Sequence, residues 1–182
     1  MSYDSLDSEK SNFEQSCLAL SILPSLQRII ISIERQRLFT FNQNSLLKEF
    51  IISTSEKPPS CQENSFGTPL GLHKVADKIG DYAALGTVFK GRKAQGFTYQ
   101  DANAEDSKLN LITTRIMRLK GLDPSINLGD PQDTYNRYIY IHGTNHESRL
   151  GTPFSKGCIE ISNSDCIELY DWATEETLVW IQ

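Results

Sequence analysis

The sequence lacks any apolar run of about 18 residues, so no segment is suited to cross a membrane as a helix. It also lacks an excess of positive charge. Its 18 Lys and Arg residues stand against 23 Asp and Glu, for a net charge of −5. Because binding to phosphates needs clustered Lys and Arg, this balance argues against nucleic acid as a partner. The exclusions leave an ordinary globular protein.

Cysteine is scarce, and its spacing excludes two common kinds of site. The four cysteines are Cys17, Cys61, Cys158 and Cys166, and no two form a CxxC pair. Neither a zinc knuckle nor a thioredoxin motif is therefore present. The segment Met1–Gln15 is acidic and polar, without the basic start and apolar stretch of a secretory signal. We expect a cytoplasmic protein with reduced thiols. A periplasmic location is the alternative, if the start is misassigned or a signal was removed.

The pattern of apolar residues predicts a mostly β fold with one or two short helices, arranged as a sandwich or open barrel. The length of 182 residues suits an N-terminal tail or short helix over 1–26 and one folded domain over 27–182. Residues 1–11 are expected to be loosely held. The β-branched and alternating segments predict strands at Arg28–Ile33, Arg37–Phe41, Leu46–Ser53, Leu72–Lys78, Gly86–Phe89, Leu111–Leu119, Arg137–Ile141 and Leu178–Ile181.

Two helices and two notable loops complete this prediction. Asn12–Leu23 is expected to be a short amphipathic helix, and Ser164–Thr174 a helix with Ser164 as its N-cap. Lys57–Leu72 is rich in Pro, Gly and Ser, and a loop of this length is uncommon in a compact domain unless it has a function. Lys90–Gly96 is interpreted as a basic turn, either solvated or closing over a site.

The most informative segment runs from Tyr138 to Ile161, YIYIHGTNHESRLGTPFSKGCIEI. A predicted strand ends at His142, and Cys158 follows sixteen residues later, after Gly157. A thiol of ordinary pKa is only slightly ionised at neutral pH, so a nearby imidazole would serve as its base. Gly143 is expected to let the chain turn sharply, and its carbonyl is a candidate to orient His142. Backbone N–H groups at Gly157 and Cys158 are candidates to hold an oxyanion.

These residues resemble the YkuD-type catalytic domain of L,D-transpeptidases. That family carries His-Gly-(Thr/Ser) at a strand end, then a glycine, then Ser-(His/Lys)-Gly-Cys followed by an apolar residue and Arg. The corresponding residues are His142-Gly143-Thr144, Gly151 and Ser155-Lys156-Gly157-Cys158-Ile159. Weaker similarities upstream extend the resemblance over about Gln27–Gln182. One departure is that Glu160 stands where the family usually has Arg.

The resemblance implies acyl transfer at the L,D bond of peptidoglycan stem peptides. Cys158 would attack the third stem residue, D-alanine would leave, and His142 would move the proton. Combined with the expected cytoplasmic location, this favours an L,D-carboxypeptidase that trims soluble tetrapeptides. The alternatives are an L,D-transpeptidase that crosslinks peptidoglycan, and an inactive peptidoglycan-binding module. The resemblance implies no metal or cofactor, and acylation by carbapenems is expected.

The remaining candidate residues have a functional and a structural interpretation. Cys17, Cys61, Cys166 and His73 are interpreted as structural, since cysteine is often a small buried hydrophobe. Ser155 is assigned to the loop that carries the nucleophile. The candidates for substrate binding are Tyr140, Thr144, His146, Arg149 and Lys156.

Overall fold

A computed structural model describes residues 3–182 of the chain, so the first two residues of the predicted tail lie outside the described residues. The domain is mostly β, which confirms the predicted fold class. Within the described residues, ten strands form one sheet. They are β1 (Gln27–Ser32), β2 (Arg37–Asn42), β3 (Ser45–Ser53), β4 (Gly71–Ile79), β5 (Thr87–Lys90), β6 (Lys93–Thr98), β7 (Ile112–Gly121), β8 (Tyr140–Thr144), β9 (Ile159–Ile161) and β10 (Leu178–Ile181).

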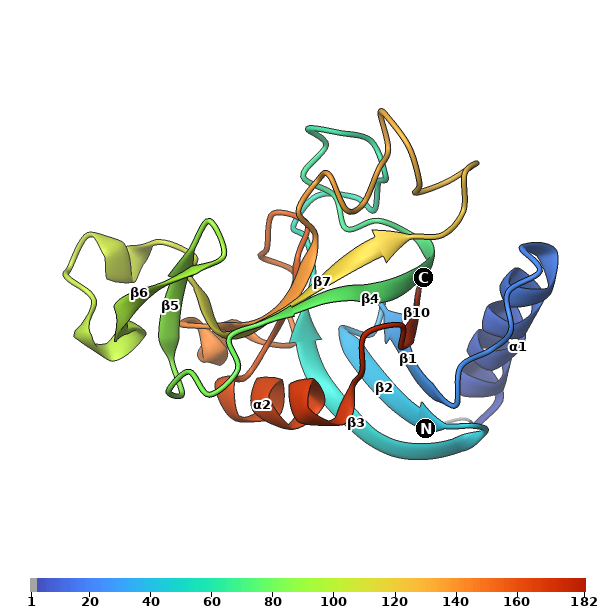
Figure 1. The fold of residues 1–182 in the computed structure, drawn as a ribbon, viewed down its shortest axis with the longest axis horizontal. Helices are drawn as coiled ribbons and strands as arrows, with labels where there is room; N and C mark the ends of the chain where they lie inside the picture. The colour runs from blue at the N-terminus through green and yellow to red at the C-terminus, as the bar shows by residue number, and fades with distance from the viewer. Residues whose placement is uncertain (1–2) are drawn as a thin grey trace.

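The sheet closes on itself. Its strand order is β4-β10-β1-β2-β3-β9-β8-β7-β5-β6, and β4 also pairs with β7. The strands from β4 through β7 in this order therefore form a ring, from which the β5–β6 hairpin projects. The α1 helix (Tyr3–Ala19) lies at the opposite end of the molecule from this hairpin, and α2 (Asn163–Trp172) lies under the sheet (Figure 1).

Apolar side chains from α2 and from every second residue of the strands fill the barrel interior. Ile29 and Ile31 of β1 point inward and join the main core, whereas Ile30 between them belongs to a second cluster outside. This is the period-two alternation of a strand that is buried on both faces. Leu169 and Tyr170 of α2 complete the inner core.

The outer cluster explains why the N-terminal segment is ordered. Phe13 and Cys17 of α1 are buried against Phe39 and Phe41 of β2. The helix spans 17 residues, so the expectation of a loose segment before a short helix at Asn12 is wrong. Within residues 3–182, no helix combines the length and apolarity needed to span a bilayer.

Several predicted boundaries differ from the structure. The predicted strand Arg137–Ile141 begins only at Tyr140, because Tyr138 has a φ of 56° and lies in a turn. Part of the basic turn is the strand β6, which pairs with β5 although four of its residues are exposed. The α2 helix is capped by Ser162, whose hydroxyl accepts from the Asp165 N–H, and not by Ser164. The part of the chain that the structure describes also contains short 3₁₀ helices at Tyr99–Asp101, Asp106–Lys108 and Glu147–Arg149.

His73 has a structural place in β4, which β7 separates from β8 in the closed sheet. Its side chain is fully buried. Its ring nitrogens lie 3.0 Å from the Gly71 carbonyl and 3.1 Å from the Thr134 hydroxyl. Burial lowers the pKa of His73 from 6.5 to about 4. The unfolded chain therefore binds a proton at higher pH than the folded chain does.

We expect the stability that depends on neutral His73 to be full above pH 6.5 and to be lost as the pH falls to about 4. The expected loss is about 3 kcal/mol of the free energy of unfolding. Urea unfolding at pH 7 and at pH 4.5 measures it. His73→Gln should flatten this pH dependence, whereas His146→Gln, which changes a partly exposed histidine, should leave it in place. An equally steep dependence in His73→Gln would contradict the assignment.

Candidate active site

The histidine lies on β8, and the cysteine directly precedes β9, the strand that runs parallel beside it. In their register, Ile141 of β8 pairs with Ile159 of β9, and His142 pairs with Glu160. The strand β9 was not predicted, and it begins directly after Cys158. Because paired residues of neighbouring strands point to the same face, His142 and Glu160 share one face, and Cys158 lies opposite Tyr140 on that face.

The loop before β9 is fixed by Ser155. Its buried hydroxyl donates to the Cys158 carbonyl at 2.6 Å and accepts from the Gly157 N–H at 3.2 Å. Gly157 has a φ of +117°, a conformation that side-chain-bearing residues rarely adopt. The Gly157 N–H, a candidate oxyanion donor, is thus already bonded to Ser155. Ser155 and Gly157 together set the place of the cysteine.

Cys158 is half-buried and packs against Phe89, Ile116 and Tyr140. Its thiol donates to the Tyr138 carbonyl at 3.6 Å. Burial is the main cause that raises the pKa of the Cys158 thiol to about 12, and the nearby Glu160 carboxylate raises it further. A hydrogen bond from the Tyr140 backbone acts in the opposite direction. At neutral pH the resting sulfur is therefore a thiol, and it needs a base to become a nucleophile.

His142 is oriented as such a base requires. Its side chain is only 3% exposed, and its Nδ1 lies 2.7 Å from the Gly143 carbonyl. A carbonyl only accepts hydrogen bonds, so Nδ1 carries the hydrogen and Nε2 keeps its lone pair. The thiol in this structure faces Tyr138, so reaction requires its rotation toward Nε2. Hydrogen bonds of catalytic groups often form only in the substrate complex.

Gly143 does not make the expected turn, since β8 continues through Thr144. Its role is spatial. A Cβ at this position would lie 2.7 Å from the Asn163 side-chain oxygen and 2.9 Å from the Thr113 carbonyl. Real Cβ atoms do not approach that closely, so only glycine lets Asn163 reach the strand beside His142.

Asn163 is a buried residue that the sequence analysis did not identify. Its amide donates to the Thr144 carbonyl at 2.8 Å and to Glu147 at 2.7 Å. Its oxygen accepts from the hydroxyls of Thr113, at 2.6 Å, and Thr114. Asn163 therefore ties the start of α2 to β7 and β8 and holds the end of the histidine strand. In the sequence, only its position five residues after Cys158 could have pointed to a role for Asn163 in the site.

Cationic and aromatic side chains gather on one side of Cys158. Arg92, at the tip of the β5–β6 hairpin, donates to the Tyr140 hydroxyl at 3.2 Å and lies 4.8 Å from the Tyr138 ring centre. Arg118 of β7 lies over the other side of this cluster, 3.3 Å from the Tyr135 ring centre and 4.8 Å from that of Tyr138. Such a surface suits the carboxylates of an acidic peptide.

The other candidates for substrate binding differ in access. Thr144 is fully buried, and its hydroxyl accepts from the His146 N–H, so direct contact with substrate is not expected there. His146 bonds to the Leu109 carbonyl at 3.1 Å. Arg149 is exposed and stacks on Phe154, with 4.3 Å to the ring centre. Lys156 is exposed on the loop that carries the nucleophile and is free to meet a substrate.

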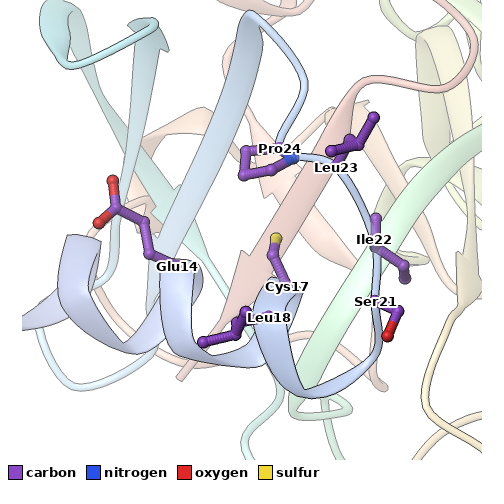
Figure 2. A pocket seen from close by; sticks show the side chains of 7 residues that line it. All are labelled: Glu14, Cys17, Leu18, Ser21, Ile22, Leu23 and Pro24. Atoms are coloured by element: carbon purple, nitrogen blue, oxygen red, sulfur yellow. The ribbon is translucent and has the colours of Figure 1, made fainter.

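Figure 2 shows a pocket elsewhere, between the end of α1 and the segment that follows it. Its volume is about 430 Å³. It is lined by residues between Glu14 and Pro24, and Cys17 points into it. None of the lining residues belongs to the His142–Cys158 segment, so this pocket is separate from the candidate active site.

A closed β-barrel with an oriented histidine on one strand, and a cysteine directly before the parallel strand beside it, defines a cysteine enzyme suited to acyl transfer. The model of the L,D-transpeptidase catalytic domain, YkuD, matches residues 26–181, and the chain belongs to this family. This confirms the resemblance drawn from the sequence. No curated protein matches the chain.

Solved structures show the same fold. An L,D-transpeptidase from Mycobacterium smegmatis is 15% identical with a TM-score of 0.53, over 86% of this chain and 58% of that one. One from Xylanimonas cellulosilytica is 15% identical with a TM-score of 0.54, over 92% and 68%. L,D-transpeptidase 3 from Mycobacterium tuberculosis, in complex with a faropenem-derived adduct, is 14% identical with a TM-score of 0.53, over 86% and 60%. This chain thus spans about three fifths of the length of two of them.

Proposed function

We propose that the protein is an L,D-carboxypeptidase that removes the terminal D-alanine from peptidoglycan tetrapeptide stems. The observation that carries this proposal is that Cys158 directly precedes β9, the strand that pairs with the His142 strand β8, and that His142 Nδ1 is held by the Gly143 carbonyl at 2.7 Å. The proposal includes a cytoplasmic location, where dissolved muropeptides meet water as the plentiful acceptor. A periplasmic enzyme that crosslinks peptidoglycan is the alternative.

The residues divide the reaction into two steps. In the first, the Cys158 sulfur attacks the carbonyl of the third stem residue while His142 Nε2 takes the thiol proton. The bond to D-alanine breaks, and His142 gives that proton to the leaving amine, which leaves a thioester. In the second, water attacks the thioester, His142 takes a proton from it, and the sulfur leaves and is reprotonated. We propose the Cys158 N–H as an oxyanion donor, because the Gly157 N–H is bonded to Ser155.

Two features of the charge distribution support this substrate and acceptor. Arg92, which is partly exposed at the tip of the hairpin and bonded to the Tyr140 hydroxyl, is placed to stabilise a carboxylate of the stem peptide. Glu160 places negative charge next to the nucleophile. An amine acceptor must lose its proton before it attacks, and a neighbouring carboxylate favours its ammonium form. Water carries no such charge, so the site favours hydrolysis over crosslinking.

We expect the purified protein to release D-alanine from a soluble disaccharide-tetrapeptide and to leave the tripeptide. Mass spectrometry of the products, with D-alanine measured by an oxidase assay, tests this. A crosslinked dimer as the main product would contradict hydrolysis and favour the transpeptidase alternative. Absence of both products, in protein that is folded, would favour an inactive binding module.

A further inference from the structure

Glu160 is placed beside the reacting pair in a way that the family pattern does not provide for. It pairs with His142 in the parallel β8–β9 register, so both side chains point to the same face. Neighbouring strands lie about 4.8 Å apart, which sets the approximate distance between the two side-chain origins. Glu160 also raises the pKa of the Cys158 thiol. One carboxylate therefore acts on the thiol and lies on the strand beside the histidine.

The carboxylate of Glu160 is buried and only half satisfied. The residue is 1% exposed. One oxygen accepts from the Asn110 side-chain amide at 2.5 Å, whereas the other is buried without a hydrogen-bond partner. Within residues 3–182, no ion pair with Glu160 is formed. An unpaired buried carboxylate is costly, so a partner is expected at some stage of the reaction.

The arginine side chains near the site are bonded to groups other than Glu160. Arg118 donates to the Tyr135 carbonyl at 2.7 Å and lies 3.6 Å from Asp77. Arg137 donates to the carbonyls of residues 60 and 67, and Arg92 is bonded to the Tyr140 hydroxyl. The charged groups that act on the Cys158 thiol are Glu160 and Arg137. Tyr140, which interacts with the thiol, is itself acted on by Arg92 and Arg118, and His142 pairs with Glu160 in the register of β8 and β9.

We propose that Glu160 is a positioning residue, whose unpartnered carboxylate oxygen is held for the His142 imidazolium that forms as Cys158 attacks. This inference rests on the proposed cysteine chemistry. When the proton passes from sulfur to Nε2, His142 becomes the cation that Glu160 lacks at rest. The negative charge of Glu160 also opposes ionisation of the Cys158 thiol at rest. The ion pair between Glu160 and the His142 imidazolium therefore forms only when substrate is in place and the sulfur attacks it.

A substrate ammonium group is the other cation that a carboxylate here would attract. The burial of the free oxygen favours His142, because a group arriving from solvent has no access to an atom with no exposed surface. A neighbour within the same face of the sheet needs no such access. The two interpretations predict different kinetics, since a substrate contact changes KM and a contact made only during reaction changes kcat.

The test compares Glu160→Gln with Glu176→Gln, which removes an equal charge from an exposed residue paired with Lys74. In Glu160→Gln we expect kcat for D-alanine release to fall about 10- to 100-fold, with KM little changed. Alkylation of Cys158 by iodoacetamide at pH 8 should become about three- to tenfold faster, because the thiolate is no longer opposed. Glu160→Asp, which keeps the charge, should retain more activity than Glu160→Gln.

These opposite changes separate a positioning role from damage to the fold. A parallel fall in turnover and in alkylation, with a lower melting temperature, would show that Glu160 is structural. A higher KM for a substrate with a free side-chain amine, but not for its N-acetyl form, would assign Glu160 to substrate binding. An unchanged kcat would also overturn the proposal. If the Cys158→Ala variant instead kept the activity of the wild-type protein, the proposed function, with Cys158 as nucleophile, would be wrong.

Discussion

Cys158→Ala is expected to lower the rate of D-alanine release by at least about 10³-fold, because loss of the nucleophile removes the covalent route entirely. The same variant should form no covalent adduct with a carbapenem, whereas the wild-type protein should gain the mass of one inhibitor molecule. Turnover and intact-protein mass spectrometry measure the two effects. Because the thiol donates one long hydrogen bond, at 3.6 Å, and otherwise accepts from the Tyr140 backbone, the free energy of unfolding should change by no more than about 1 kcal/mol.

Cys61→Ala is the matched control, since Cys61 is also a half-buried free cysteine. Its sulfur interacts with the backbone of Leu70, in the loop between β3 and β4. Activity and the carbapenem adduct should both survive this substitution. If Cys158→Ala kept more than a few per cent of wild-type turnover, or if the adduct formed on Cys61, the assignment of the nucleophile would be wrong.

The sequence was sufficient for the parts of the fold that depend on local pattern. Segments rich in β-branched residues, such as Arg28–Ile33 and Leu178–Ile181, form strands within a residue or two of the prediction. The spacing of His142 and Cys158 was also informative, because the family pattern joins them. The structure then places Cys158 directly before the strand that pairs with the His142 strand, which spacing alone does not establish.

Features that depend on tertiary contacts were not predictable. The strand β6 has little apolar pattern, and it forms because β5 supplies its hydrogen-bonding partner. Gly143 was interpreted as a turn residue, yet the crowding by Asn163 that requires glycine comes from α2. Glu160 was visible only as a departure from the family pattern. Its burial and its contact with Asn110, 50 residues away in the chain, appear only in the folded protein.

The dependence on His142 should be large, because burial holds the Cys158 pKa at about 12. At pH 7.5, a thiol with that pKa is ionised in only about one molecule in 10⁴ to 10⁵. A base that accepts the proton during attack removes the need for a preformed thiolate. The contribution of His142 should therefore be of the same order as this ionisation deficit.

We expect His142→Asn to lower kcat/KM at pH 7.5 by about 10⁴-fold. Because the remaining activity would depend on the free thiolate, the rate of the variant should rise about tenfold per pH unit between pH 7 and pH 10, where the protein remains folded. A pH profile of D-alanine release measures both effects. His73→Gln, which changes a buried histidine in another part of the barrel, should keep the wild-type profile at neutral pH. A His142→Asn rate that is low but independent of pH would show that the histidine orients the thiol without serving as its base.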